Sequence, residues 1–164
     1  MSRPCALMFV AMAAPLLAAD SAEETLIRQL IEKAYVHGAF NEQNTVDMAM
    51  GFHRELAIFS AKGTDLGRYA IGSWIEGIEK RKTSSDYDPN RSKMDHKISK
   101  IDVTGGAAHA KVELSKNGKL IYTDYLSFIR FACPSSGLRM VGKSRPRFTT
   151  GTNDRCFSCP GHSR

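Results

Sequence analysis

The chain has 164 residues, a length that fits one domain able to bury a core without disulfide bonds. Hydrophobic residues make up 42% of it and charged residues 24%, as in an ordinary soluble globular protein. The formal net charge is +6, but the last 26 residues hold six basic side chains against one acidic one. Because the rest of the chain is nearly neutral, the basic stripe expected of a folded nucleic-acid-binding domain is missing, and we predict no nucleic-acid partner.

Residues 1–19 have the pattern of an export signal. Arg3 gives the basic start, Cys5–Leu17 the apolar stretch, and Ala18 and Ala19 the small residues before a cleavage point. The apolar stretch is too short to cross a bilayer, and no later stretch is apolar enough. A buried or disordered N-terminus is the alternative to this interpretation. We expect a periplasmic or secreted protein that has no contact with the membrane after cleavage.

Cleavage would leave one domain over residues 20–144 and a basic tail over residues 145–164, predicted to be disordered. An odd number of cysteines would remain: Cys133, Cys156 and Cys159. Cys156 and Cys159 have the C-x-x-C spacing of redox and zinc sites, with His162 nearby. They lack the strand-to-helix context of a redox motif and the fourth ligand of a structural zinc site. We therefore predict neither a metal nor a cofactor.

Three helices are predicted in the first half of the domain. Apolar residues recur every three or four positions over residues 23–37, and Gly38 is typical of a helix end. Thr45 can cap a short second helix over residues 46–50. A third helix is predicted over residues 68–82, with its basic residues at the C-terminal end.

The second half of the domain alternates like a β-sheet. Short strands are predicted over residues 56–59, 93–103 and 137–143. Residues 107–131 form two alternating runs joined at Asn117-Gly118, and Asn-Gly is the strongest short-range signal for a hairpin. Helices followed by antiparallel strands predict the α+β class.

The hairpin turn also predicts which side chains share a face. With Asn117 and Gly118 in the loop, Lys116 lies opposite Lys119. The inner face would then carry Ala108, Ala110, Val112, Leu114, Ile121, Thr123, Tyr125 and Ser127. The outer face would pair Lys111 with Asp124. A shift of one residue in either strand would exchange its two faces, so every later placement depends on this register.

Four stretches carry a resemblance to a known family: AYVHGAFNEQNTVDMAMGFHRELAIF, IGSWIEGI, KISKIDVTGGAAHAKVEL and YTDYLSFIRF. They resemble the nuclear transport factor 2-like superfamily, within it the group called putative lumazine-binding or SnoaL-like. The resemblance implies a cone-shaped fold, with three N-terminal helices packed on a strongly curved antiparallel sheet around a cavity. It also implies a homodimer formed through the outer face of the sheet. The superfamily includes isomerases, dehydratases, cyclases and proteins without known activity.

We expect a small-molecule site in this cavity, lined by Tyr35, His53, Trp74, Val112, Thr123 and Tyr125. His53 is a candidate general base because the pKa of histidine lies near physiological pH, and Asp47 is a candidate to orient it. The Tyr125 hydroxyl could donate to a ligand carbonyl. The structural alternatives are a surface or capping role for His53, a core role for Tyr125, and a helix-N-terminal role for Asp47, which we favour.

Three functions fit these patterns. The first is a module that binds a small aromatic or heterocyclic ligand. The second is an acid–base isomerase, dehydratase or cyclase that uses His53 with Tyr125 or Asp47. The third is a structural dimer without chemistry. An isomerase of the ketosteroid type needs a carboxylate base and an oxyanion-binding pair inside the cavity, and the sequence predicts no inward pair of acids. We therefore expect binding before catalysis.

Overall fold

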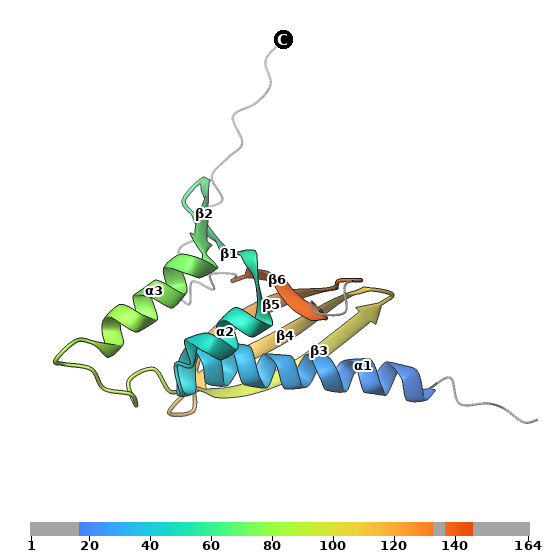
Figure 1. Cartoon of the computed structure of the whole chain (residues 1–164), viewed down its shortest axis with the longest axis horizontal. Helices are drawn as coiled ribbons and strands as arrows, with labels where there is room; N and C mark the ends of the chain where they lie inside the picture. The colour runs from blue at the N-terminus through green and yellow to red at the C-terminus, as the bar shows by residue number, and fades with distance from the viewer. Residues whose placement is uncertain (1–16, 133–136, 146–164) are drawn as a thin grey trace, which may run out of the picture.

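The computed structural model of the chain describes residues 17–132 and 137–145 (Figure 1). Most of the predicted export signal and the predicted tail beyond Arg145 lie outside the described residues, as do all three remaining cysteines. In the described part of the chain, helices lie across one face of a curved, mostly antiparallel sheet, as predicted for the α+β class.

The first helix is longer than its predicted range. α1 (Leu17–Leu30) runs directly into η1 (Ile31–Asn41), which continues with the wider turns of a π-helix. Gly38, predicted as the end, lies inside η1, where a Cβ atom would come within 3.1 Å of both the Lys33 carbonyl oxygen and the Met48 side chain. The glycine is needed for close contact between helices, so the prediction of a helix end there was wrong.

Two shorter helices follow. α2 (Thr45–Gly51) is capped by Asn44, whose side chain accepts from the backbone N–H groups of Val46 and Asp47, so the cap is one residue earlier than predicted. α3 (Ile71–Lys82) begins three residues after the predicted start, because Asp65–Ala70 pairs as a strand instead.

The described strands form one sheet in the order β2-β1-β6-β5-β4-β3. Their bounds are Phe52–Lys62 for β1, Asp65–Ala70 for β2, Asp95–Thr104 for β3, Ala107–Lys116 for β4, Lys119–Arg130 for β5 and Leu138–Ser144 for β6. All neighbours are antiparallel except β1 and β6, which are parallel. Each predicted strand is present, and β2 is an addition.

The β4–β5 hairpin begins as predicted and then changes register. Asn117 and Gly118 both have positive φ, and Lys116 lies opposite Lys119. Two positions further, Leu114 pairs with Tyr122, which leaves Ile121 as an extra residue in a β-bulge. From Tyr122 onward the alternation of β5 is therefore reversed relative to the prediction.

This bulge overturns the predicted facing of β5. Asp124 points inward and is fully buried, whereas Tyr125 points outward with 43% of its surface exposed. Thr123 lies opposite Glu113 on the outer side, although neighbouring residues bury it. The predicted pair of Lys111 and Asp124 does not form. The facing of β4 was correct, since its alternate residues from Ala108 to Leu114 are buried.

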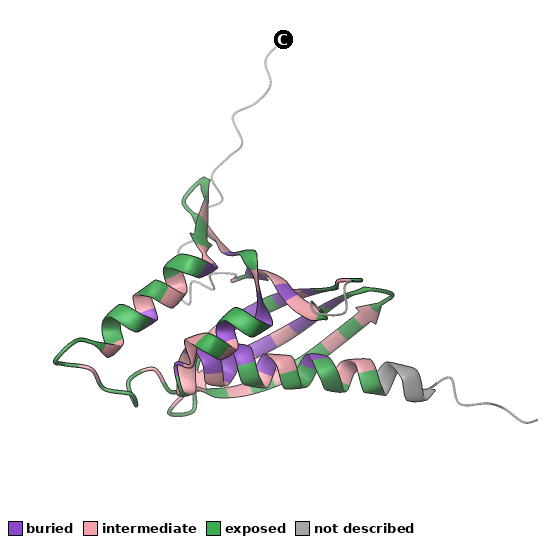
Figure 2. Cartoon of the chain, viewed as in Figure 1, coloured by how far each residue is buried: buried purple, intermediate pink, exposed green. Residues whose placement is uncertain are grey.

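Buried residues gather where α1, η1 and α2 cross the sheet (Figure 2). The core consists of aliphatic side chains from the helices and from the inner faces of β1, β4, β5 and β6, with Tyr35, Phe52 and Phe128 as its buried aromatic residues. The inner face of the sheet is thus covered at one end by α1, and a group of polar residues lies at the other end of the same core.

Candidate functional site

The buried charges of the described chain lie together on the inner face of the sheet. The Ile121 bulge turns Asp124 inward on β5. On β6, Phe128 pairs with Met140 and Ser127 with Gly142, so Val141 is the extra residue of a second bulge. That bulge turns Lys143 inward opposite Leu126 and brings Arg145 across from Asp124. We call Asp124, Lys143 and Arg145, with Tyr35 of η1, the buried charge cluster.

Asp124 is the centre of this cluster. The Arg145 guanidinium donates from Nε to Oδ1 at 2.8 Å and from Nη2 to Oδ2 at 3.0 Å, a bidentate arrangement that holds the carboxylate plane. The Tyr35 hydroxyl donates to Oδ2. The Lys143 Nζ is 3.3 Å from the same Oδ2 but is not aligned for a hydrogen bond. Both carboxylate oxygens of Asp124 therefore accept hydrogen bonds from other residues, while Lys143 is attracted to Asp124 without forming a hydrogen bond.

Aromatic rings enclose the lysine. Its Nζ lies 4.6 Å from the centre of the Tyr35 ring, 4.8 Å from that of Trp74 and 5.8 Å from that of Phe40. These distances are in the range of cation–π attraction. Within the described residues, no acceptor takes a hydrogen bond from Nζ. The amine thus lies in an apolar shell with one carboxylate beside it.

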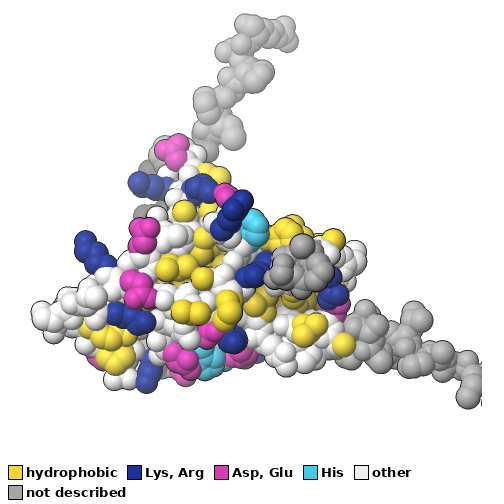
Figure 3. Space-filling model, in the orientation of Figure 1, with side chains coloured by type: hydrophobic (Ala, Val, Ile, Leu, Met, Phe, Trp, Pro, Cys, Tyr) yellow, Lys and Arg dark blue, Asp and Glu magenta, His cyan; other side chains and the backbone are white. Residues whose placement is uncertain are grey.

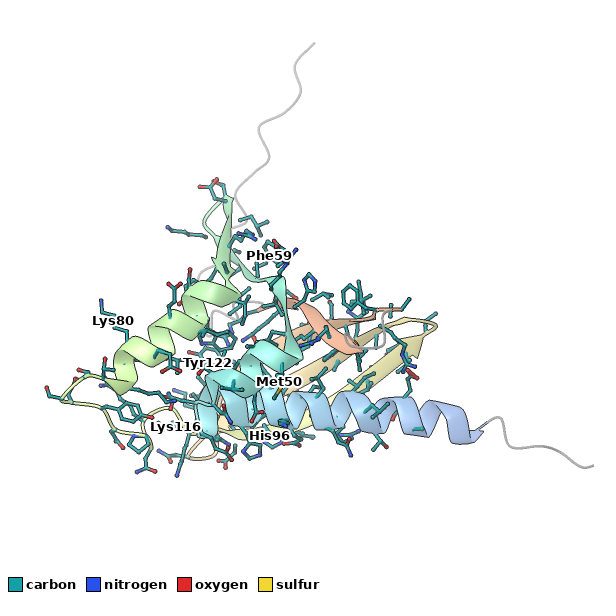
Figure 4. The ribbon with its side chains drawn as sticks, viewed as in Figure 1. Met50, Phe59, Lys80, His96, Lys116 and Tyr122 are labelled. Atoms are coloured by element: carbon teal, nitrogen blue, oxygen red, sulfur yellow. The ribbon has the colours of Figure 1, made fainter. Side chains whose placement is uncertain are left out.

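The side of the cluster nearest to solvent is formed by partly exposed groups. Trp74 of α3 stacks on Phe52, and its other neighbours are Phe40 and Tyr35. The Arg145 guanidinium lies 3.5 Å from the centre of the Tyr122 ring and is about a quarter exposed. In the view of Figure 4, Tyr122 lies between α3 and α2. A ligand that reached Lys143 would first meet Trp74, Tyr122 and Arg145.

Burial sets the protonation of the lysine. The pKa of Lys143 falls to about 7, because removal from water destabilises the ammonium more than the Asp124 carboxylate stabilises it. Burial also raises the pKa of the Tyr35 phenol well above its ordinary value, and Asp124 adds to this shift. Burial alone would raise the pKa of Asp124 as well. The Arg145 hydrogen bonds and the two nearby cations outweigh it and keep that pKa below its ordinary value.

The arrangement can therefore present a carboxylate, a guanidinium and an amine that exchanges its proton near neutral pH, all beside aromatic rings. No three His, Cys, Asp or Glu side chains of the described part come close enough to hold a metal ion. Nor does any described helix have the length and apolar character needed to cross a membrane.

Comparison with known proteins identifies the family of the chain. The profile of the family described as "Putative lumazine-binding" matches residues 22–132. The chain belongs to this family. No protein of curated function matches the sequence.

Solved structures share the fold of this chain. One is an NTF2-like protein of unknown function from Shewanella baltica, with 19% identity, a TM-score of 0.59 and coverage of 76% of this chain and 93% of that one. Another, from Silicibacter pomeroyi and also of unknown function, has 18% identity, a TM-score of 0.58 and coverage of 77% and 96%. An NTF2-like superfamily protein from Salmonella enterica serovar Typhimurium has 16% identity, a TM-score of 0.53 and coverage of 82% and 99%. At these identities the likeness shows the NTF2-like fold alone.

Three of the residues predicted to line the pocket lie in or beside the buried charge cluster. Tyr35 and Trp74 enclose the lysine, and Val112 of β4 lies directly across from Asp124. Thr123 and Tyr125 lie on the other face of the sheet, for the reason given above. The structure therefore brings together part of the predicted set, around charged groups that the sequence analysis had assigned elsewhere or passed over.

The predicted pair of His53 and Asp47 is not assembled. The His53 ring stacks on Phe131 at 5.2 Å, and its Nδ1 accepts from the Glu55 backbone N–H. Asp47 lies 3.4 Å from Lys33 and accepts from the Asn44 side chain at 2.8 Å, the helix-N-terminal role that we favoured. Neither residue contacts the buried charge cluster in the contacts found for the described chain.

Sequence reasoning missed Asp124, Lys143 and Arg145 as a site. Strict alternation from Met140 places Lys143 outward, and only a bulge reverses it. One signal was available. Tyr122, Asp124, Leu126 and Phe128 are two apart and include three large apolar residues, so the inner face could have been assigned to this set from the C-terminal end of β5.

A separate groove lies outside this cluster. It has a volume of about 660 Å³ and runs between α1, α2 and the ends of β5 and β6. In the view of Figure 3, hydrophobic side chains gather over α1 and α2 and towards β6. Leu26 and Met50, which line the groove, are each about half exposed. Asp47 also lines it, so this predicted residue faces a groove but not the interior of the fold.

Proposed function

We propose that this protein binds a small planar heterocycle on the inner face of the sheet, at the buried charge cluster. The observation that carries the proposal is the Lys143 amino group, buried among aromatic rings beside one carboxylate and without a hydrogen bond. A buried polar group without a partner costs free energy, so a ligand carbonyl or ring nitrogen at this point would be stabilised by it. The family description supports a lumazine-like ligand.

The chemistry around the lysine matches such a ligand. Trp74 and Tyr122 are partly exposed rings of the kind on which a planar ring system stacks. Asp124 can accept from a ring N–H if Tyr35 or Arg145 yields one position. Arg145 and Lys143 can donate to ring carbonyls. Lumazine carries ring carbonyls and ring N–H groups on a flat bicycle, and it is therefore the first probe to use.

Thermal unfolding and calorimetric titration with lumazine test the proposal. A ligand present at 100 times its Kd stabilises the folded state by about 2.7 kcal/mol, which is a measurable rise in Tm. The Lys143→Met variant should lose most of this rise, because its side chain has similar volume but cannot donate. Lys111→Met is the matched control, since Lys111 lies on the outer face beside Glu113. No rise with lumazine in a wild-type protein that unfolds cooperatively would contradict the proposal.

Acid–base catalysis is the second candidate, and it now rests on other residues. The His53, Tyr125 and Asp47 set is dispersed, so that version of the enzyme has no support in the geometry. The combination of Lys143, with a pKa of about 7, and the Asp124 carboxylate favours proton exchange at the inner face instead. Turnover of any substrate should then fall at least tenfold in Lys143→Met with the fold intact.

We also propose export and a homodimer through the outer face of the sheet. The apolar stretch before residue 20 supports export. Tyr125 and Ile129 support the dimer, because both are 43% exposed on the outer side of β5. Native mass spectrometry of protein recovered from the periplasm or the medium reports the cleavage site, the oligomeric state and any retained ligand together. A monomer at micromolar concentration would contradict the dimer, and an uncleaved cytoplasmic chain would contradict export.

A further inference from the structure

We infer that Lys143 is a carbonyl-reactive amine, and that the inner-face site takes ligands with an aldehyde or ketone group by forming an imine with this residue. The inference deepens the proposed function, because it uses the same site and adds a covalent step. It rests on the position of Nζ: buried among aromatic rings, without a hydrogen bond and 3.3 Å from one carboxylate oxygen.

The first requirement is a neutral amine, since an ammonium has no lone pair for attack. An exposed lysine, with an ordinary pKa of about 10.4, is neutral in roughly one molecule in 2,500 at pH 7. Lys143 has a pKa of about 7 and is therefore neutral in about half of the molecules. The cause is structural. The rings of Tyr35, Trp74 and Phe40 exclude water from Nζ, which is the setting in which lysines act as nucleophiles.

The charged groups that face Nζ act in opposite directions. Asp124 on β5 favours the ammonium, and Arg145 beyond the end of β6 disfavours it. The Tyr35 hydroxyl on η1 donates a hydrogen bond to Asp124, and its raised pKa keeps the phenol neutral. α3 contributes Trp74, which does not titrate. Burial outweighs the single carboxylate, so the amine form is accessible at neutral pH while the carboxylate stays ionised.

The second requirement is a group that moves protons. The amine nitrogen attacks the carbonyl carbon, so a C–N bond forms and the C=O π electrons move to oxygen. When the Arg145 side chain rotates away from Oδ1, Asp124 can accept a proton from the nitrogen and return it to this oxygen, which gives a carbinolamine. The C–O bond then breaks, the second amine proton leaves with the hydroxyl as water, and the nitrogen lone pair forms the C=N bond. One amine and one carbonyl give one imine and one water, without change of oxidation state.

The third requirement is access. Lys143 is 2% exposed, so a ligand can reach its amine only if a neighbouring side chain moves. Arg145 is the outermost member of the cluster, and its guanidinium lies flat against Tyr122. The Arg145 side chain contacts Asp124 and this ring, and the Arg145 backbone N–H donates to the Phe59 carbonyl at 3.2 Å. Rotation of the Arg145 side chain, with its backbone still held by β1, would open a path to the amine beside Trp74.

The test uses the full chain with benzaldehyde as the probe and sodium cyanoborohydride to fix any imine as a secondary amine at pH 7. Peptide mapping by mass spectrometry then locates the label. Under limiting reagent we expect Lys143 to be labelled at least tenfold faster than any exposed lysine. Lys143→Met should abolish the fast phase, whereas Lys111→Met, on the outer face, should leave it unchanged. Label spread over exposed lysines with Lys143 unmodified would overturn the inference.

The wild-type protein gives a second, independent reading should Lys143→Met fail to fold. Labelling at Lys143 should rise to half of its maximum near pH 7, and labelling at exposed lysines should keep rising towards pH 10. A Lys143 profile that follows the exposed lysines would overturn the inference. Lumazine binding without fast labelling would leave the proposed function and remove the covalent step. Fast labelling without lumazine binding would support the reactive amine and remove the lumazine-like ligand.

Discussion

Two lysine–carboxylate pairs lie on opposite faces of the same sheet, and they behave in opposite ways. On the outer face, Lys111 donates to Glu113 at 2.7 Å, and each side chain is about a third exposed. On the inner face, Lys143 lies 3.3 Å from Asp124, and both side chains are buried. The hydrogen bond that Lys111 donates to Glu113 raises the pKa of Lys111, whereas burial lowers the pKa of Lys143 to about 7.

The comparison shows that an acidic neighbour does not decide the charge of a lysine by itself. Water stabilises the Lys111 ammonium, so the neighbouring carboxylate only adds to that stability. At Lys143 the desolvation is larger than the attraction, partly because Asp124 is already shared with Arg145 and Tyr35. The outer pair is thus an ordinary surface ion pair, while the inner one is a site with unused bonding capacity.

Removal of the inner carboxylate should have the largest effect on stability. Asp124→Asn would leave Lys143 and Arg145 without their counter-charge in a buried place, and we expect the free energy of unfolding at pH 7 to fall by about 3–5 kcal/mol. Urea unfolding followed by circular dichroism measures the change. Glu113→Gln is the matched change on the outer face and should leave the midpoint almost unaltered. Equal losses from the two variants would mean that the faces do not differ as described.

The next largest effect should be on the pH dependence of stability, to which Lys143 and Lys111 contribute in opposite directions. Lys143 has a folded pKa of about 7 and an unfolded pKa of about 10.4, so between these values the unfolded state binds more protons and stability rises with pH. Below about pH 7 the folded state carries the full penalty of a buried ammonium. Wild-type protein should therefore gain stability relative to Lys143→Met between pH 7 and 10. Lys111 has a raised folded pKa, so its contribution is present at neutral pH and is lost only as pH rises above the ordinary lysine value.

Differential scanning fluorimetry of wild-type, Lys143→Met and Lys111→Met proteins between pH 7 and 10 measures how the stability that each lysine contributes changes with pH. Tyr35 also titrates differently in the folded and unfolded states, but it is common to all three proteins and its effect cancels in the differences. A flat difference between wild type and Lys143→Met from pH 7 to 10 would show that the buried amine keeps an ordinary pKa.

Substitution of Arg145, at the edge of the inner cluster, should lower the free energy of unfolding by less than substitution of Asp124. Arg145→Lys keeps the charge but loses both the bidentate contact with Asp124 and the flat contact with Tyr122. We expect a loss of about 1–2 kcal/mol in the free energy of unfolding, since hydrogen bonds to charged groups contribute about 1.5–3 kcal/mol and the lysine recovers part. Urea unfolding measures it, and a loss as large as that of Asp124→Asn would contradict a role at the edge of the cluster.

The contrast also explains what could be predicted from the sequence. The class of fold, the helices and the inward face of β4 follow from periodicity, and the hairpin turn follows from Asn117-Gly118. The inner site does not, because it depends on bulges at Ile121 and Val141, each of which reverses a strand. Alternation counts residues and cannot register an inserted one. Trp74 was found because helical periodicity is regular in α3, and Tyr35 was found because the apolar repeat of residues 23–37 reaches it before the wider turns of η1 change the spacing much.

Added salt should have the smallest effect, a difference between the pKa of Glu113 on the outer face and that of Asp124 on the inner face. The Glu113 carboxylate is partly exposed, and its pKa is lowered by the hydrogen bond and the charge of Lys111. Mobile ions at 1 M shorten the Debye length to about 3 Å, so they should weaken that attraction and move the Glu113 pKa back towards its ordinary value. Asp124 is fully buried beside its partners, so its lowered pKa should change much less than that of Glu113. Carboxyl-carbon NMR titrations at low and high salt measure both. A shift of equal size at Asp124 would show that solvent ions enter the inner cluster, and would place Lys143 in contact with water as well.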